Sequence, residues 1–192
     1  MAISHLKIKS FRNHKEKNFS FNDGITVIFG ENGSGKTSIL ESIYVLSMGK
    51  SFKTNRQKEM IKKGNNAFFI KGDFIREKTK ETISILIEKD LSKKIKINDK
   101  NIYKRKELIG RNNIVVLSPE EQEITKGPAK KRRVFFDKLF SITSKKYLHI
   151  IQKYNKVLKQ RNAILKLKKD INDKIKIIQP WNQLIIEKGL LL

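Results

Sequence analysis

Residues 25–40 read ITVIFGENGSGKTSIL, and this stretch decides the fold. It contains the pattern G-x-x-x-x-G-K-[ST] of the phosphate-binding loop at residues 30–37. The apolar, mostly β-branched residues before the loop predict a buried strand, and the amphipathic residues 38–46 after it predict a helix. Because this motif binds phosphate where a strand turns into a helix, the stretch predicts a site for a nucleoside triphosphate.

Each part of the loop has its own role in holding phosphate. Glycines let successive backbone N–H groups turn towards phosphate oxygens without a Cβ in the way. The helix that begins near Lys36 adds unpaired N–H groups and the positive end of its dipole. Lys36 is placed to reach the β- and γ-phosphates, and the Thr37 hydroxyl is placed to hold Mg²⁺.

The composition narrows the class of protein. With 192 residues the chain is long enough for one large domain or two small ones. The absence of cysteine excludes disulfides, a cysteine zinc site and a thiol nucleophile. No apolar run approaches the roughly 20 residues that span a membrane, and no basic-then-apolar leader opens the sequence. These features lead us to expect a cytosolic protein without a membrane partner.

The net charge of +24 points to a polyanionic partner. Most of the basic residues are lysines, which are also ordinary solvated surface residues. Charge alone therefore leaves two interpretations open: the basic residues bind nucleic acid, or they form a solvated basic surface without such a partner.

Two strands are expected before the loop. Residues 3–11 alternate loosely in hydrophobicity, and residues 17–21 do so again before the turn signal at residues 22–24. Arg12 and Asn13 lie at the strand end between them, where they would either close a turn or touch the nucleotide.

The segments after the loop helix predict a β-rich region. The helix is expected to end at Met48-Gly49, and Thr54 to Gln57 fits a capping box for a short helix ending at Gly64. Period-two alternation then predicts an antiparallel meander. Its strands are expected at residues 67–75, 82–88, 94–97 and 102–103.

The chain then changes to a basic, helical character. Residues 113–117 predict one more buried strand, and Ser118-Pro119-Glu120-Glu121 predicts a helix start. Apolar residues at spacings of three, four and seven predict a helix of about 25 residues from Ser144. A further helix is expected to start at Pro180-Trp181. We therefore place a nucleotide-binding lobe at residues 1–117 and a basic helical lobe at residues 118–192.

Several segments resemble the RecF family, within the SMC, Rad50 and RecF group of ABC-type ATPases. A strand ending in Phe11-Arg-Asn13, a second strand and an Asp-Gly turn before the phosphate loop are typical of the whole group. The segments that resemble the RecF family itself are Leu40-Glu-Ser-Ile-Tyr44, Gly49-Lys-Ser51, Lys58-Glu-Met-Ile61 with Gly64, Ser118-Pro-Glu120, Gly127-Pro128 with Arg132-Arg133, Phe136-Asp137, Tyr154-Asn-Lys-Val-Leu158 and Gln160-Arg-Asn162.

The resemblance implies an α/β fold, a P-loop ABC-type ATPase head with a β-rich nucleotide-binding lobe followed by a truncated helical lobe. It also implies ATP and Mg²⁺ as cofactors and an ATP-dependent homodimer that binds single-stranded and gapped double-stranded DNA. Such proteins help to load recombinase at gaps with recombination mediator proteins, and they act in the cytoplasm at the nucleoid in replication, repair and the SOS response. The nucleotide-binding residues implied are Gly30, Glu31, Asn32, Gly33, Ser34, Gly35, Lys36, Thr37 and Ser38, with Arg12 and Asn13 near the base or phosphates.

The chain departs from the family pattern because no Walker B strand ending in acidic residues and no Ser-x-Gly-Gln signature occur in it. We therefore expect slow ATP hydrolysis only from a full-length dimer and name no catalytic residue. The sequence is expected to be the N-terminal part of a longer protein, or a truncated copy.

Two alternatives remain beside an ATP-gated repair protein. One is a basic nucleic-acid-binding fragment whose binding ignores ATP. The other is an SMC or Rad50 head, which would require heptads sustained well beyond residue 165. The candidate DNA contacts are Lys53, Arg56, Lys130, Lys131, Arg132, Arg133 and Arg161, each of which is equally compatible with a solvated surface role.

Overall fold

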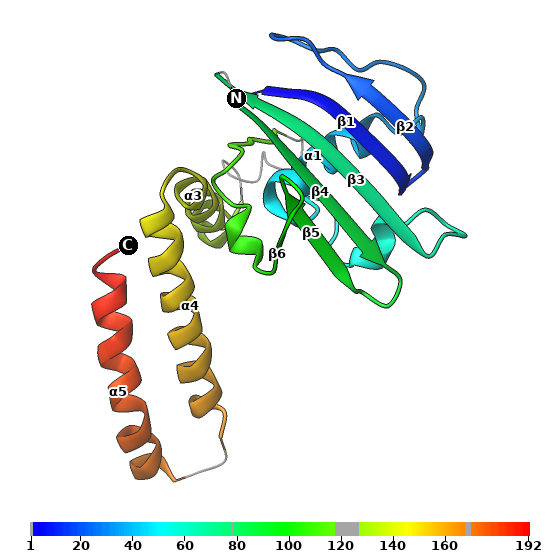
Figure 1. Cartoon of the computed structure of the whole chain (residues 1–192). Coiled ribbons are helices and arrows are strands. Elements are labelled where there is room, and N and C mark those ends of the chain that lie inside the picture. The colour runs from blue at the N-terminus through cyan, green and yellow to red at the C-terminus, as the bar shows by residue number, and fades with distance from the viewer. Residues whose placement is uncertain (1, 78, 118–126, 168–169) are drawn as a thin grey trace. The chain divides into compact units, whose positions relative to one another are not determined.

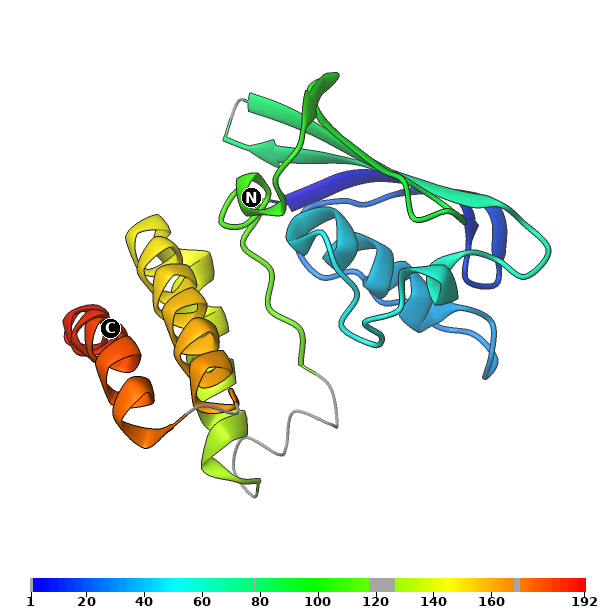
Figure 2. The ribbon, with the colours of Figure 1, turned by 90° about the horizontal axis from the view of Figure 1, so that it is seen from below.

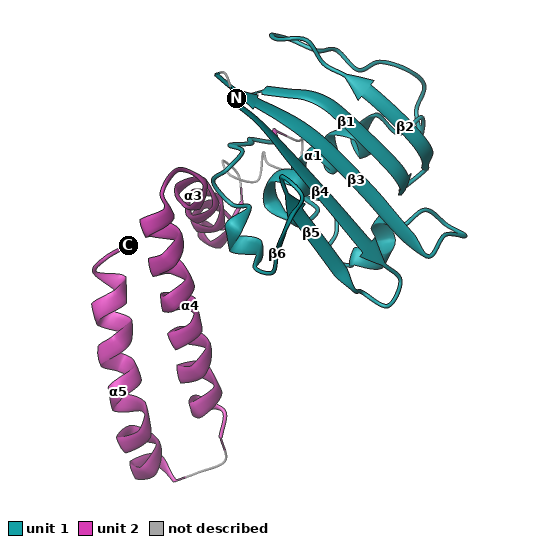
Figure 3. Cartoon of the chain, viewed as in Figure 1, with its two compact units in different colours: residues 1–116 teal, residues 117–192 magenta. Residues whose placement is uncertain are grey.

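The computed structural model describes residues 2–77, 79–117, 127–167 and 170–192 (Figure 1). The chain divides into two compact units, residues 1–116 and 117–192, shown in different colours in Figure 3. Each unit is described by itself below.

The first unit is built on a six-stranded sheet with the order β2-β1-β3-β4-β5-β6. All neighbouring strands are antiparallel, so the predicted meander is confirmed. Along β4 every second side chain is buried, which is the alternation expected for a sheet with one covered face. The strands are β1 (Ala2–Phe11), β2 (His14–Ser20), β3 (Ala67–Arg76), β4 (Thr79–Glu88), β5 (Lys93–Ile97) and β6 (Lys100–Ile102).

Helix α1 (Lys36–Met48) covers one face of this sheet, as seen from below in Figure 2. It contacts β1, β3 and β4, and the core lies between the helix and these strands. Leu46 of the helix and Ile8, Ile70 and Ile85 of the three strands are all fully buried. The helix ends where the sequence predicts, at the left-handed Gly49 with φ 64°. This packing fixes the helix that follows the phosphate loop.

We expect Gly72→Ala to destabilise the first unit. A Cβ at this β3 position would lie 2.7 Å from Leu46 Cδ1 and 3.2 Å from Phe74 Cε2, so the added methyl group would push against the buried helix. Overpacking of this kind costs about 1–3 kcal/mol, although alanine is otherwise favoured over glycine in a strand. Urea unfolding measures the change. Lys71→Ala, at the neighbouring exposed position, is the control and should shift the free energy of unfolding by less than about 0.5 kcal/mol. Equal stabilities for the two variants would contradict the close approach of β3 to Leu46 at Gly72.

The buried strand predicted directly before the phosphate loop is wrong. Ile25, Val27 and Phe29 are 96, 74 and 89% exposed and belong to no strand. Apolar β-branched runs form strands covered on both faces only where neighbouring strands supply the pairing. None of the six strands in the described part of the chain pairs with this segment.

The buried strand predicted at residues 113–117 is also wrong, because Val115 and Leu117 are 75 and 91% exposed and the segment has no strand partner in the described chain. The helix start predicted at residues 118–121 lies outside the described residues.

The predicted helix between Thr54 and Gly64 is reduced to a short 3₁₀ helix, η1 (Gln57–Met60). The Thr54 hydroxyl accepts a hydrogen bond from the Arg56 amide at 3.0 Å and donates one to Glu59 Oε2 at 2.6 Å. A threonine that bonds two residues ahead closes a local turn instead of capping a helix. The predicted capping box is therefore not formed.

The described residues of the second unit form three helices: α3 (Ala129–Thr143), α4 (Lys145–Leu165) and α5 (Ile171–Gly189). Ser144 caps α4, because its hydroxyl accepts a hydrogen bond from the Tyr147 amide at 3.2 Å. Helices α4 and α5 pack side by side (Figure 1). The predicted helix from Ser144 is thus confirmed, but it ends at Leu165 and packs against the next helix. Within the described residues, α4 and α5 are therefore two separate helices and not the single continuous helix that a coiled-coil arm would begin with.

The prediction that a helix restarts at Pro180 is wrong, because α5 already begins at Ile171 and contains Pro180 in its interior. Asp170 caps this helix, since its side chain accepts a hydrogen bond from the Asn172 amide at 3.0 Å. A proline removes one intrahelical hydrogen bond, and the packing against α4 carries the helix through.

We expect Tyr147 to titrate late. Its hydroxyl donates a 2.6 Å hydrogen bond to Asp137 of α3, and burial, followed by this bond and the nearby carboxylate charge, raises the pKa of Tyr147 to about 12. The folded-state pKa lies above the value of about 10 for an unfolded tyrosine. The resulting stabilisation is therefore complete below about pH 10 and is lost as the pH rises through about 12.

Absorbance titration of the phenolates measures this shift. Tyr147→Phe should remove the late component, whereas Tyr103→Phe, at a residue that is 90% exposed, should leave it in place. A wild-type titration without a late component would contradict the α3–α4 contact.

Candidate nucleotide site

The phosphate loop leads directly into the first turn of α1. Gly30, Gly33 and Gly35 have φ values of 144°, 82° and 98°, a backbone region that residues with a Cβ rarely adopt. Gly35 caps α1 without a side-chain hydrogen bond, and the first turn carries no acidic residue. The backbone of the loop and the positive end of the helix dipole therefore remain available to an anion.

Lys36 is held by the loop itself. Its Nζ donates hydrogen bonds to the carbonyl oxygens of Gly30 at 2.7 Å and Glu31 at 2.8 Å. Both acceptors are neutral, and a phosphate oxygen is a stronger acceptor because it is charged. An arriving phosphate would therefore draw the ammonium group away from these carbonyls.

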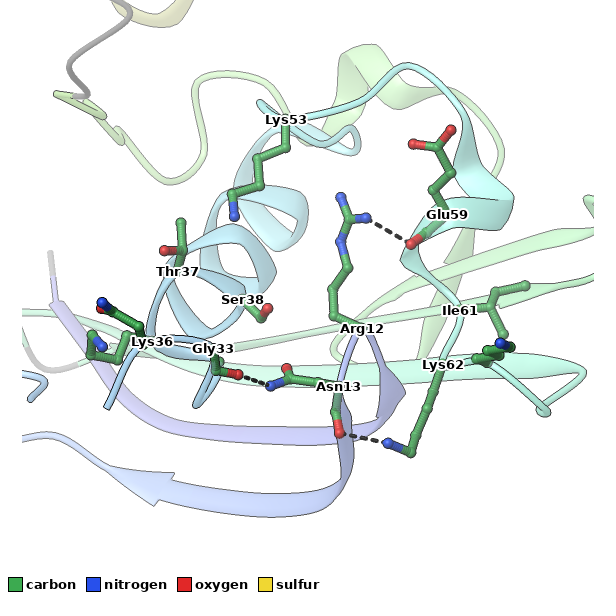
Figure 4. A pocket seen from close by; sticks show the side chains of 13 residues that line it. Arg12, Asn13, Gly33, Lys36, Thr37, Ser38, Lys53, Glu59, Ile61 and Lys62 are labelled. Carbon is green, nitrogen blue, oxygen red and sulfur yellow. Dashed lines mark hydrogen bonds between the residues drawn. The ribbon is translucent and has the colours of Figure 1, made fainter. Parts of the chain in front are cut away.

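The turn between β1 and β2 supports the loop from the side. Asn13 Nδ2 donates to the Gly33 carbonyl at 2.9 Å (Figure 4). His14 Nε2 lies 3.2 Å from the Gly35 carbonyl, where it would donate. Lys62 in turn donates to the Asn13 carbonyl at 2.7 Å. Asn13 therefore positions the loop in this structure, and its contact with a nucleotide stays a prediction. The supporting role of His14 had no signal in the sequence.

Arg12 is tied to a buried carboxylate. Its Nε and Nη2 donate to Glu41 Oε2 at 2.8 Å and Oε1 at 2.5 Å, and Nη1 donates to the Glu59 carbonyl at 2.7 Å. Glu41 is fully buried in α1 and also accepts a hydrogen bond from the Ser51 hydroxyl at 2.5 Å. Paired charges are the condition for burying a carboxylate. Arg12 thus neutralises the buried Glu41 and also lies at the candidate nucleotide site.

These elements enclose a cavity of about 780 Å³. Lys36, Thr37 and Ser38 lie on one side of it and Ile61 and Lys62 on the other (Figure 4). The predicted nucleotide residues that line it are Arg12, Asn13, Asn32, Gly33, Gly35, Lys36, Thr37 and Ser38. The other predicted residues, Gly30, Glu31 and Ser34, do not line it, although the carbonyls of the first two hold Lys36.

The sequence did not predict four lining residues, Glu59, Ile61, Lys62 and Lys63. Glu59 and Ile61 belong to the Lys58-Glu-Met-Ile61 segment that resembles the RecF family, and Lys62 and Lys63 follow it directly, so this resemblance was the available signal. Ile61 forms a bridge with Phe11, and the Lys62 amide donates to the Ser10 carbonyl at 2.8 Å. These contacts bring the segment beside the end of β1.

The candidate DNA contacts are scattered. Lys53 lines the nucleotide cavity, and Arg56 lies outside it with Nη1 3.6 Å from Glu59 Oε1. In the second unit Arg161 Nε donates to Asn182 Oδ1 at 2.6 Å. The remaining candidates are exposed in the first turns of α3: Lys130, Lys131, Arg132 and Arg133. Their contacts with DNA stay predictions.

Neither a metal-binding cluster nor a membrane-spanning helix occurs among the described residues. No three acidic, histidine or cysteine side chains there come together as a metal site. No helix in the same residues combines the length and apolar character needed to cross a membrane.

Residues 2–120 match the family described as "RecF/RecN/SMC N terminal domain". The match covers more than half of the chain, and the chain belongs to this family. Within it, a protein of Clostridioides difficile described as DNA replication and repair protein RecF is 41% identical over 166 residues, which is 86% of this chain and 44% of the relative. A protein of Desulfitobacterium hafniense with the same description is 38% identical over 190 residues, 98% of this chain and 52% of the relative.

A solved structure described as the recombination mediator protein RecF with ATP in the RecFOR pathway has a similar fold. Its TM-score is 0.86 at 29% identity, and the match covers 97% of this chain and 50% of that chain. The RecF resemblance of the sequence and the fold of a P-loop ABC-type ATPase head are thereby confirmed. The chain spans about half the length of the curated relatives it matches.

Proposed function

We propose that this chain supplies the ATP-binding part of a RecF-type DNA repair and recombination protein. The observation that carries the proposal is the cavity at the N-terminus of α1, lined by Lys36, Thr37, Gly33 and Gly35. A cavity of about 780 Å³ suits a nucleotide, since pockets for small ligands span roughly 300–1,000 Å³. The related solved structure described as RecF with ATP supports the same ligand.

The residues of the site fit MgATP. The glycine-rich backbone and the uncapped start of α1 would bind the phosphates, and Lys36 would exchange two carbonyl acceptors for phosphate oxygens. Thr37 lines the cavity and would hold Mg²⁺, which would bridge phosphate oxygens and offset their charge. Lys53 and Lys62 on the cavity wall add positive charge where a triphosphate needs it.

ATP would join two heads into a homodimer, and hydrolysis would require that dimer, because this chain contains neither a Walker B strand nor a signature motif. No residue of the described site is therefore assigned as a catalytic base. In this proposal ATP binding acts as a switch for DNA binding, and slow turnover resets it.

The proposed DNA partner is single-stranded or gapped double-stranded DNA. Four basic residues follow the start of α3 directly, Lys130, Lys131, Arg132 and Arg133. All four side chains are exposed, and DNA phosphates would bind positive charge presented in this way. By family membership we further propose recombinase loading with recombination mediator proteins, at the nucleoid in the cytoplasm and within the SOS response.

Equilibrium DNA binding tests the proposal. Fluorescence anisotropy would measure binding of single-stranded and gapped DNA at several salt concentrations, with and without MgATP. We expect ATP to tighten binding and Lys36→Ala to remove that gain. Equal affinity with and without ATP, falling only with salt, would instead identify a basic nucleic-acid-binding fragment.

A further inference from the structure

A second cavity, of about 350 Å³, lies at the other end of α1 from the nucleotide site. It shares no lining residue with the nucleotide cavity. Three cations line it, Lys50, Lys93 and Arg105, together with the uncharged polar side chains of Thr54 and Asn55. No carboxylate is among its lining residues, all of which belong to the described first unit. The cavity is therefore positively charged.

The fold brings two of these cations to the same point. Lys93 at the start of β5 donates a 2.7 Å hydrogen bond to the Gly49 carbonyl at the end of α1. Arg105 of η2 (Arg105–Glu107) lies against the same residue, because a Cβ on Gly49 would be 2.6 Å from Arg105 Cγ. Neither cation pairs with a carboxylate in the described part of the chain.

The two cations act on each other unfavourably. Burial, and then the positive charge of Arg105, lower the pKa of Lys93 below its ordinary value. An anion in the cavity would reverse both effects, because it would neutralise the charge that burial and repulsion penalise. A purely structural role, capping the end of α1, would use one of the three N–H donors of Lys93. It would not explain why Arg105 lies beside Lys93.

We propose that this cavity binds a backbone phosphate of single-stranded DNA. Arg105 offers a planar fork of donors and Lys93 a point charge, which are the two common ways in which proteins bind phosphate. The side-chain amide of Asn55 would supply neutral donors beside them. The site deepens the proposed function and rests on it, since the partner is the DNA proposed above.

The site also has a direct structural link to the nucleotide cavity. Ser51 lines the second cavity and donates a hydrogen bond to Glu41. Arg12 lines the nucleotide cavity and donates to the same carboxylate. Both proposed ligand sites are therefore connected to the buried Glu41, the DNA site through Ser51 and the ATP site through Arg12.

The test compares two pairs of substitutions in the full chain. Lys93→Gln/Arg105→Gln removes both charges, and glutamine can still donate to the Gly49 carbonyl. Lys96→Gln/Lys106→Gln removes the same charge from exposed neighbours in β5 and η2 and serves as the control. The probe is a fluorescent oligothymidylate, whose dissociation constant is measured against salt concentration.

We expect the site pair to weaken binding by about tenfold and to reduce the slope of log K against log salt by about 0.7 for each lost contact. The control pair should change both quantities much less. Equal losses in the two pairs, or no loss in the site pair, would overturn the site. If Lys93→Gln unfolds the chain, Arg105→Gln alone should give about half of the slope change, and an unchanged slope would again overturn the site.

Two further results distinguish a failure of the phosphate site from a failure of the proposed function. Titration with pyrophosphate distinguishes a small anion from DNA: a site pair that loses pyrophosphate binding but keeps its DNA affinity would overturn the DNA assignment. If wild-type protein binds DNA with an ATP gain while the site pair behaves like wild type, the phosphate site fails and the proposed function stands. If wild-type protein binds no DNA, both fail.

Discussion

Lys36→Ala is expected to weaken ATP binding by about ten- to a hundredfold. The substitution removes the only side chain of the motif that carries positive charge, and hydrogen bonds to charged groups contribute about 1.5–3 kcal/mol. The loop itself should persist, because Asn13 and His14 hold the carbonyls of Gly33 and Gly35 independently of Lys36. Isothermal titration with MgATP measures the change.

The matched control is Lys96→Ala, which removes one exposed lysine from β5, away from the cavity. It should leave the ATP affinity unchanged apart from a small, salt-dependent effect of net charge. Equal affinities for wild type and Lys36→Ala would show that the nucleotide does not reach the loop.

Arg12→Ala is expected to destabilise the first unit by about 3–5 kcal/mol. The substitution leaves Glu41 fully buried, and among the described residues only the Ser51 hydroxyl still pairs with it, so its charge is no longer compensated. It also removes the hydrogen bond from Nη1 to the Glu59 carbonyl, which ties the turn to the cavity wall. Urea unfolding followed by circular dichroism measures the loss.

An exposed ion pair provides the comparison. Lys7 and Glu16 lie 3.2 Å apart on β1 and β2 with both side chains almost half exposed, and Lys7→Ala should cost less than about 1 kcal/mol. Arg12→Met/Glu41→Leu should recover part of the loss, because it removes both charges and keeps much of the volume. An Arg12→Ala variant as stable as Lys7→Ala would contradict a stabilising role of the buried pair between Arg12 and Glu41.

Two parts of the fold that depend on local sequence, the meander and the ends of α1, were predicted. The meander from β3 to β6 follows from period-two alternation, and α1 begins and ends at glycines whose left-handed backbone is required there. The phosphate loop could be recognised for the same reason, because the spacing of its glycines and Lys36 is local, while the contacts of these residues with a nucleotide stay a prediction.

Contacts between distant segments could not be predicted. Glu41 stands among apolar residues of α1, and only the folded structure shows that Arg12, 29 positions earlier, neutralises it. Burial is equally non-local: Ile25 and Val115 have the composition of strand residues, yet they are exposed because no neighbouring strand in the described chain covers them. Packing against α4 likewise decided that Pro180 lies inside a helix.

Amide hydrogen exchange with and without MgATP tests most directly whether the cavity at the start of α1 is a nucleotide site. The backbone N–H groups of residues 31–38 should exchange more slowly with ATP, because phosphate oxygens would accept their hydrogen bonds. Protection should extend to residues 59–63 on the opposite wall and disappear in Lys36→Ala. Unchanged exchange at residues 31–38 under saturating ATP would contradict the nucleotide site.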